Sequence, residues 1–171
     1  MHRHDHNIYV VGWQEVVRFP DWDNIKMKAK VDTGARSSAI HAEEYEVRHL
    51  PGTKERPLNE QIHMKLKVGP KSKPKFVWVK APVVDYRNVK NSGGKIEERP
   101  FIETQIEIGG VKHSIILSVT NREKMKFPIL LGRAFLASKF LVDSHAKNLL
   151  SGHPVSKSVQ PASDDSEGEE E

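Results

Sequence analysis

The segment KVDTGARSSAIHA, Lys30 to Ala42, decides how this chain is interpreted. It continues a run in which apolar residues and lysines alternate, as they do in a strand with one buried face. The run then stops at Asp32, Thr33 and Gly34. Aspartate and glycine close many strands in ordinary turns, so the tripeptide alone fits either a turn or a catalytic loop. The remainder of the chain decides between the two.

Alternation with a period of two recurs along most of the chain and predicts strands. The sequences GPKSKPK and NVKNSGGKI are typical of hairpin connections, and only the segment RAFLASK predicts a helix, a short one. Many short strands separated by turns predict an all-β fold, a small antiparallel barrel or sandwich. The predicted strands are 8–19, 24–31, 61–68, 76–84, 100–108, 111–120, 140–143 and 148–151.

Length and composition indicate one soluble globular domain. The chain has 171 residues, of which 37% are hydrophobic and 29% charged, and its apolar runs are too short for a membrane-spanning helix. The first residues lack the features of a signal peptide, so we expect a cytoplasmic protein. Without cysteine there is no disulfide and no thiol nucleophile. We expect a flexible N-terminus at 1–7, a domain at 8–150 and a disordered acidic tail at 151–171.

The charge is distributed unevenly between the domain and the tail. Six acids and no basic residue lie after Ala162. Without these six, the chain has 27 basic and 17 acidic residues, a net charge of about +10. A basic body favours anionic partners, whereas the simpler interpretation is a solubilising surface with an acidic end.

A second motif follows the first by about a hundred residues. In FPILLGRAFL, Phe127 to Leu136, an apolar strand ends at Gly132, and Arg133 begins a short helical turn. Retroviral-type aspartic peptidases pair an Asp-Thr-Gly loop with such a segment. A glycine at that position lets two backbones approach closely. Two motifs in this order are far more specific than the tripeptide alone.

From about Val10 to Asp143 the chain resembles one family. The matching stretches are VGWQEVV, IKMKAKVDTGARSSAIHA, PVVDYRNVKNSGGKIEERPFI and TNREKMKFPILLGRAFLASKFLVD. They resemble the bacterial retropepsin-like aspartic peptidases that were long labelled ATP-dependent zinc proteases. The resemblance implies a small closed β-barrel with one short helix. It also implies a functional link to an ATP-grasp glutamate ligase and to the small-subunit ribosomal protein that the ligase modifies, some members trimming the added glutamates.

The resemblance further implies an aspartic endopeptidase. Asp32 is the expected catalytic residue, and two such carboxylates would share one proton around the attacking water. Because the chain has no second Asp-Thr-Gly or Asp-Ser-Gly, a homodimer is expected to supply the second Asp32. The expected substrate-binding residues are Thr33, Gly34, Ala35, Arg36, Ser37, Ser92, Gly132 and Arg133.

Arg36 departs from the viral pattern. Viral relatives usually carry an acid there, which pairs with the arginine of the Gly-Arg segment. With Arg36 in its place, we expect Arg36 and Arg133 to face the cleft without a neutralising acid. Guanidinium groups bind carboxylates in a bidentate fashion, so this cleft favours glutamate-rich or polyglutamate peptides.

Other residues admit two interpretations. Asp85, Arg87, Glu97 and Arg99 match polar positions of the family and either bind substrate or pair with one another beside the cleft. Of the hairpins around 91–94 and 69–75, we expect the first to be the flap, because glycine-rich tips suit a moving lid. The three tryptophans, Trp13, Trp22 and Trp78, are expected to pack in the core or at its rim.

Parts of the sequence fit two alternative functions and a metal site. The first alternative is a non-catalytic dimer of the same fold that binds acidic peptides or proteins. The second is a nucleic-acid-binding protein, which only the basic charge supports, so a nucleic-acid partner is disfavoured. His2, His4 and His6 surround Asp5, but the chain lacks a His-Glu-x-x-His motif and a phosphate-binding Gly-Lys loop. We therefore expect no metal, no cofactor and no membrane partner.

Overall fold

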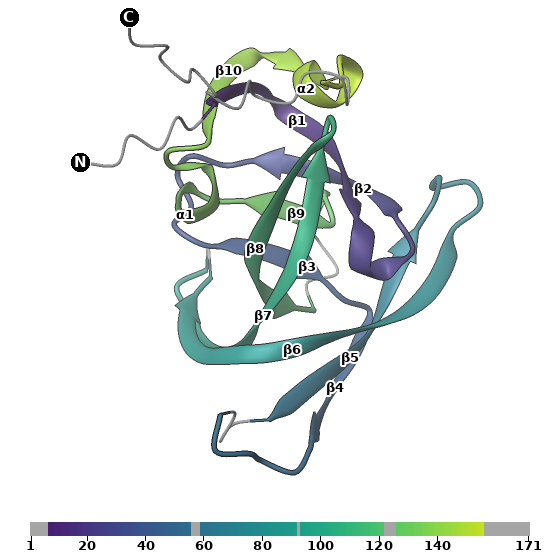
Figure 1. Ribbon diagram of the computed structural model, residues 1–171, viewed down its shortest axis with the longest axis vertical. Helices are drawn as coiled ribbons and strands as arrows, with labels where there is room; N and C mark the ends of the chain where they lie inside the picture. Colours follow the sequence, from purple (N-terminus) through teal and green to yellow (C-terminus); the bar gives the residue numbers. More distant parts are fainter. Residues whose placement is uncertain (1–6, 56–58, 92, 122–125, 156–171) are drawn as a thin grey trace, which may run out of the picture.

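The structure, a computed structural model, describes residues 7–55, 59–91, 93–121 and 126–155 (Figure 1). Its strands and helices follow one another along the chain in this order: β1 Tyr9–Phe19, η1 Pro20–Trp22, β2 Ile25–Val31, β3 Ser38–His41, β4 Glu44–His49, β5 Glu60–Val68, β6 Lys75–Lys90, β7 Ile96–Ile108, β8 Val111–Thr120, β9 Ile129–Leu131, α1 Arg133–Leu136, β10 Phe140–Lys147 and α2 Leu149–Gly152.

Six of these strands form a closed barrel, as the sequence predicts. Their order is β1-β2-β9-β3-β8-β7, and β7 returns to β1 through the pair Arg18 and Glu107. Strands β6, β5 and β4 continue from β7 as an extension of the sheet, and β10 lies along the other edge of β1. In Figure 1 the β5–β6 hairpin projects from the barrel on the right, and the β4–β5 hairpin projects below it.

The core follows from the alternation in the sequence. On β2, Met27, Ala29 and Val31 point inward and are at most 7% exposed, whereas the lysines between them are exposed. On β5, the alternating apolar residues Ile62 and Met64 are fully buried. Burial of a valine, isoleucine or methionine side chain contributes roughly 1.5–3 kcal/mol, which keeps the register of the strands.

Three strand pairs contradict the expectation of an antiparallel barrel. β1 runs parallel to β10, β2 parallel to β9, and β3 parallel to β8. Parallel pairing requires a long connection between the two strands, and each of these pairs joins segments that are far apart in the chain. Because pairing partners so distant leave no local turn signal, the alternation shows the strands but not their direction.

Three further expectations about elements were wrong or incomplete. The segment 148–151 forms the start of a second helix, α2, and not a strand, so the fold has more than the one predicted helix. Asn148 adopts a left-handed conformation with φ of 54° and accepts a hydrogen bond from the Gly152 N–H. Strands β3 and β4 were not predicted, since each is short and β4 is largely exposed.

Glu15 explains why α2 forms there. This glutamate is completely buried, and its carboxylate accepts hydrogen bonds from the backbone N–H groups of Gly12, Leu150 and Ser151 and from the Ser151 hydroxyl. Burial raises the pKa of Glu15, but the four hydrogen bonds outweigh it, and the net result is a pKa below the ordinary value. The carboxylate therefore caps a helix 135 residues away in the sequence.

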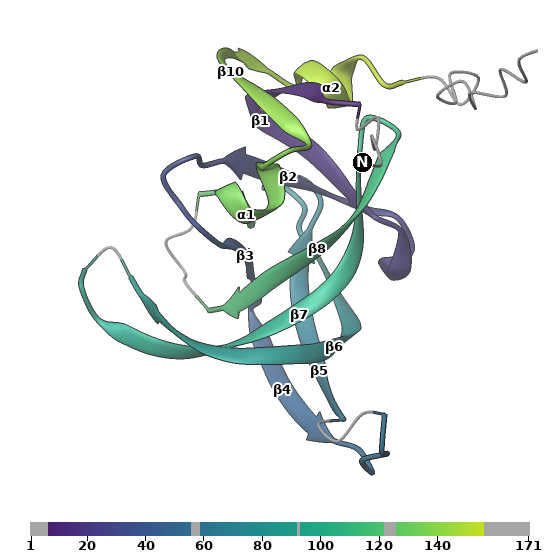
Figure 2. The ribbon, with the colours of Figure 1, turned by 60° about the vertical axis from the view of Figure 1, so that its left-hand side comes forward.

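The two candidate flaps lie on different sides of the barrel. In Figures 1 and 2 the tip of the β6–β7 hairpin lies on the same side as α1 and the connection between β2 and β3. The tip of the β5–β6 hairpin lies on the opposite side in Figure 1. None of the described helices is long and apolar enough to cross a membrane.

Candidate active site

The Asp-Thr-Gly segment lies in the connection from β2 to β3. Asp32 is the first residue after β2, and its N–H donates to the Leu131 carbonyl of the parallel strand β9 at 2.9 Å. The Asp32 carbonyl accepts from the Ala35 N–H at 3.2 Å, which closes a tight turn. The tripeptide is therefore a turn, and that turn is anchored to the second motif.

The turn presents the Asp32 side chain in a defined orientation. Its Oδ1 accepts a hydrogen bond from the Gly34 N–H at 2.9 Å. The side chain is partly buried, and Thr33 and Gly34 beside it are exposed. Among the described residues, no donor is bonded to the other oxygen, Oδ2. A carboxylate held at one oxygen and accessible at the other can accept a proton from water.

Gly132 packs directly against this loop. A Cβ atom at Gly132 would lie 2.6 Å from the Ser37 carbonyl oxygen, closer than real Cβ atoms approach, and 3.0 Å from that of Ala35. The Gly132 N–H donates to Ser38 Oγ at 3.0 Å. The prediction that this glycine permits the close approach of two backbones is confirmed.

Arg133 binds the loop itself. Its Nη1 donates to the carbonyls of Thr33 and Gly34, both at 3.2 Å, and its N–H donates to the Ala35 carbonyl at 2.8 Å. The expectation that Arg133 faces the cleft without a neutralising acid stays a prediction. No carboxylate in the described part of the chain pairs with its side chain, and part of its donor capacity serves these carbonyls. Arg36 is exposed, and none of the carboxylates in the described part of the chain pairs with it.

A cavity of about 260 Å³ adjoins the loop at Ser37 and α1 at Ala134. Two cations line it, each stacked on an aromatic ring. The Arg87 guanidinium lies 4.5 Å from the centre of the Phe101 ring, and Lys139 Nζ lies 5.1 Å from that of Phe135. Cations fixed in this way lose little side-chain entropy when they bind an anion.

The polar residues near the β6–β7 hairpin pair with one another. Arg87 Nε lies 2.7 Å from Asp85 Oδ2, and Arg99 Nε lies 3.4 Å from Glu97 Oε2. The hydrogen bond from Arg87, followed by that from the Tyr86 N–H, lowers the pKa of Asp85. Of the two interpretations open from the sequence, the structure supports mutual pairing, although Arg87 also reaches the cavity.

Some residues that the sequence singled out lie outside the described ranges or away from the Asp32 carboxylate. Ser92, the expected substrate-binding residue of the flap, lies outside the described residues, as do His2, His4 and His6. His41, which follows the loop, lies on β3 with its Nε2 3.4 Å from Glu43 Oε1. Within the described part of the chain, no group of three or more His, Asp or Glu residues could hold a metal ion.

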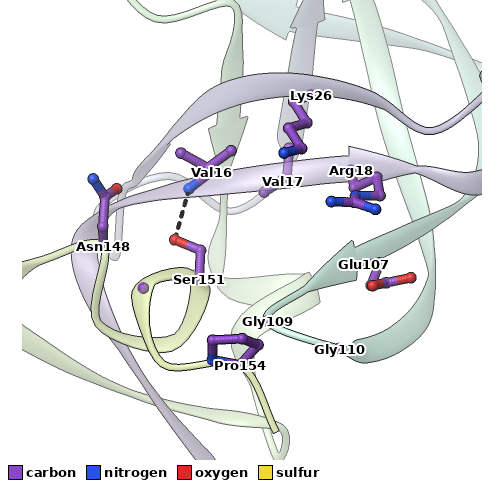
Figure 3. Close-up of a pocket in the computed structure, with 11 residues that line it drawn as sticks. Val16, Val17, Arg18, Lys26, Glu107, Gly109, Gly110, Asn148, Ser151 and Pro154 are labelled. Atoms are coloured by element: carbon purple, nitrogen blue, oxygen red, sulfur yellow. Dashed lines mark hydrogen bonds between the residues drawn. The ribbon is translucent and has the colours of Figure 1, made fainter. Parts of the chain in front are cut away.

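A larger cavity than this one lies elsewhere, beside α2 (Figure 3). It has a volume of about 370 Å³ and includes Arg18, Lys26 and Glu107, but no residue of the Asp32 loop or of the Gly132–Arg133 segment. Figure 3 shows the Val16 N–H donating to Ser151 Oγ at its wall. Its one carboxylate, Glu107, lies opposite Arg18 across β1 and β7, so this cavity offers no pair of acids for hydrolysis.

Comparison with known proteins identifies the family of the chain. Residues 10–151 match the family described as "RimB-like: Retropepsin-like aspartic endopeptidase RimB". A "Probable alpha-L-glutamate ligase" from Shewanella halifaxensis is 35% identical over 80% of this chain, and one from Desulfotalea psychrophila is 31% identical over 78%. The chain spans only 29% and 28% of the lengths of these two relatives.

A solved structure shares the fold. The Legionella pneumophila protein Lpg0085, of unknown function, superposes with a TM-score of 0.64 at 23% identity, covering 84% of this chain and 99% of its own. At this identity the likeness concerns the fold alone. The family match covers most of the chain and both motifs of the site. The chain therefore belongs to the RimB-like family of retropepsin-like aspartic endopeptidases.

Proposed function

We propose that the protein is an aspartic peptidase that hydrolyses peptide bonds in glutamate-rich chains. The observation that carries this proposal is the Asp32 carboxylate, fixed through Oδ1 by the Gly34 N–H, with Oδ2 unbonded within the described residues. Gly132 packs against the loop that bears it, and Arg133 donates hydrogen bonds to the loop's carbonyls. The family match supports the same activity.

The chemistry requires a second carboxylate. In the proposed homodimer, the loops of two copies meet at the two-fold axis, and the two Asp32 carboxylates share one proton because they cannot both ionise at such short range. The ionised carboxylate accepts a proton from the attacking water, and the protonated one donates to the carbonyl oxygen of the scissile bond. The tetrahedral intermediate then collapses as the leaving amine is protonated.

The cations near the loop support an acidic substrate. Arg36 has no carboxylate partner among the described residues, and Arg87 and Lys139 line the adjoining cavity. Because Arg87 is already paired with Asp85, Arg36 and Lys139 are the cations that would pair with glutamate side chains on either side of the scissile bond. The names of the relatives refer to glutamate ligases, which supports a link of this protein to glutamate chains.

The test is cleavage of defined peptides by the purified protein, followed by mass spectrometry. Oligoglutamate and a neutral peptide of equal length are incubated with the wild type, with Asp32→Asn and with the control Asp23→Asn, which alters an exposed aspartate outside the loop. We expect cleavage by the wild type and the control only. Binding of oligoglutamate without cleavage by the wild type would favour the non-catalytic binding protein.

A further inference from the structure

The outer surface of β5 and β6 carries exposed aromatic side chains among lysines. We call the residues Lys65, Lys67, Phe76, Trp78 and Lys80 the lysine–aromatic face. Trp78 is 59% exposed and Phe76 is 50% exposed, although the sequence predicted that Trp78 packs in the core or at its rim. Trp22, by contrast, is 5% exposed and packs on Phe19. Exposed large aromatic residues that lie together often mark a binding surface.

The register of the two strands brings these residues together. Lys65 lies opposite Trp78, and Lys67 lies opposite Phe76. Residues directly opposite in an antiparallel pair point to the same face. The alternate residues of both strands, such as Met64 and Val79, are buried on the other face, so the orientation of the lysine–aromatic face is set by the core. Lys65 Nζ lies 4.9 Å from the centre of the Phe76 ring.

The whole hairpin is basic. Residues 61–84 contain six lysines and no acidic residue, and two of the lysines, Lys71 and Lys73, lie at the tip between the strands. Burial, followed by the nearby cations Arg48 and Lys80, lowers the pKa of His63 on the same hairpin, and Glu46 partly offsets this effect. Of these two cations, Lys80 belongs to the hairpin and Arg48 to the neighbouring strand β4.

The edge strand β4 contributes acids at one border. Glu44 lies opposite Lys65, and Glu46 lies opposite His63. The Glu46 carboxylate binds Arg48, with Oε1 2.6 Å from the Arg48 Nη2. The border nearest β4 is consequently mixed in charge, whereas the surface over β6 and the hairpin tip remains basic.

The sequence disfavoured a nucleic-acid partner because only its charge supported one, but the exposed rings beside the lysines add a second feature. We propose that the lysine–aromatic face binds single-stranded RNA. Lysines neutralise the phosphates, and the exposed rings of Phe76 and Trp78 stack on unpaired bases, which is how sheet surfaces bind single strands. A duplex hides the faces of its bases, so the two rings select against it. RNA is the favoured occupant because folded RNAs present loops and bulges with unstacked bases.

The charge of the face argues against two copies of this chain meeting there. A two-fold interface brings the same patch against itself, and this would place the lysines of one hairpin against those of the other. An acidic peptide would form ion pairs with the lysines but would offer no planar group to stack on the two aromatic rings. The face also lies on the hairpin that projects away from the Asp32 loop (Figure 1), so RNA binding is independent of the proposed peptidase activity.

The test measures binding of a labelled, unpaired RNA of roughly a dozen nucleotides, the length that a small single-strand-binding domain covers. We expect Trp78→Ala to weaken binding roughly 5- to 150-fold, the range for loss of one base-stacking contact. The slope of log K against the logarithm of the salt concentration is negative. The double variant Lys65→Gln with Lys67→Gln should make it shallower by about 1.4, since each lost phosphate contact accounts for about 0.7 on a single strand.

The matched control for charge is Lys26→Gln with Lys28→Gln, which removes two exposed lysines at the same spacing on β2. This control should leave the slope unchanged. Peptide cleavage by Trp78→Ala should equal that of the wild type, which shows that the variant is folded. Because Trp22 is buried and Trp13 lies on β1, outside this face, fluorescence quenching by RNA should fall sharply in Trp78→Phe while binding persists.

Several results would overturn the proposal. Equal binding of the matching duplex would exclude stacking, and tighter binding of the same sequence as DNA would exclude RNA as the favoured occupant. Displacement of the RNA by oligoglutamate at equal charge would assign the face to acidic peptides. Dissociation of a dimer on Trp78→Ala, seen in sedimentation, would assign it to a second copy, and binding only to anionic vesicles would assign it to a lipid surface.

Discussion

The guanidinium of Arg133 lies 3.2 Å from the carbonyl oxygen of Thr33, one hundred residues earlier in the chain. The same Nη1 also reaches the Gly34 carbonyl, so one side chain fixes two successive peptide groups of the loop. These carbonyls lie next to the N–H that holds Asp32 Oδ1. The orientation of the candidate catalytic carboxylate therefore depends on a residue of the second motif.

The first prediction concerns Arg133→Lys. A lysine keeps the charge but cannot reproduce the planar group that reaches both carbonyls, so the loop should become less ordered. We expect kcat for peptide cleavage to fall roughly tenfold, the effect of losing about one exposed charge-assisted hydrogen bond. The melting temperature should change little. Unchanged kcat would mean that Arg133 does not position the loop.

The second prediction concerns Gly132→Ala. The added Cβ would lie 2.6 Å from the Ser37 carbonyl oxygen, which is backbone and cannot rotate away. We expect the free energy of unfolding to fall by roughly 1–3 kcal/mol, the range for overpacking, with loss of cleavage. Chemical denaturation measures this change.

Gly152→Ala is the matched control for that substitution. Gly152 lies in α2, and a Cβ there would meet only the Asn148 Cβ at an ordinary distance of 3.9 Å. Alanine is favoured over glycine in helices by up to about 1 kcal/mol, so this variant should be neutral or more stable. Equal destabilisation by both substitutions would contradict the argument from close approach.

The third prediction concerns pH and Glu15. Its pKa is lowered in the folded state, so the ionised carboxylate contributes stability above the unfolded pKa, near 4.5, and that contribution is lost as the pH falls through the folded pKa. The free energy of unfolding should therefore drop as the pH is lowered from 5 toward 3. Glu15→Gln should be less stable at pH 7 and should show a shallower dependence in this range.

Denaturant midpoints across the pH series measure this effect. Glu103→Gln is the matched control, because Glu103 accepts a hydrogen bond from Ser114 Oγ on the exposed surface. It should follow the wild type closely. A pH dependence of Glu15→Gln identical to that of the wild type would show that the capping carboxylate does not govern acid stability.

The two motifs allowed much of the site to be predicted from the sequence. The glycine of the second motif was expected to permit a close backbone approach, and its neighbours in space are Ala35 and Ser37. The role of Arg133 was not foreseen, since its partners are backbone carbonyls, and carbonyls carry no residue-specific signal in a sequence. The position of Oδ2 relative to a second Asp32 stays a prediction.

The fold shows where local patterns fail. The alternation of β2 and β5 predicted their buried faces, because each buried residue alternates with a more exposed one. The pattern of 148–151 predicts a strand, whereas the helix found there depends on Glu15, 135 residues earlier. In FVWV both alternate faces are apolar, so the period could not show whether Trp78 or Val79 is buried.

The fourth prediction concerns the dimer. Each chain supplies one Asp-Thr-Gly loop, so an active peptidase requires two copies. Sedimentation should show a dimer, or a monomer that dimerises when oligoglutamate is added, because ligand that binds only the dimer stabilises it by mass action. Mixing the wild type with excess Asp32→Asn should lower the activity, since mixed dimers lack one acid. Full activity of a strict monomer would exclude the shared site.

The last prediction concerns the cations beside the loop. If glutamate side chains of the substrate pair with Arg36 and Lys139, cleavage of oligoglutamate should weaken as salt rises, whereas cleavage of a neutral peptide should not. Arg36→Gln and Lys139→Gln should each lower kcat/KM for oligoglutamate by roughly fivefold or more, the effect of losing about 1 kcal/mol of charge pairing near the surface. Lys112→Gln, which removes a lysine from β8 outside this cavity, is the control. Equal losses on the neutral and the acidic peptide would show that these cations support the fold of the site and do not select its substrate.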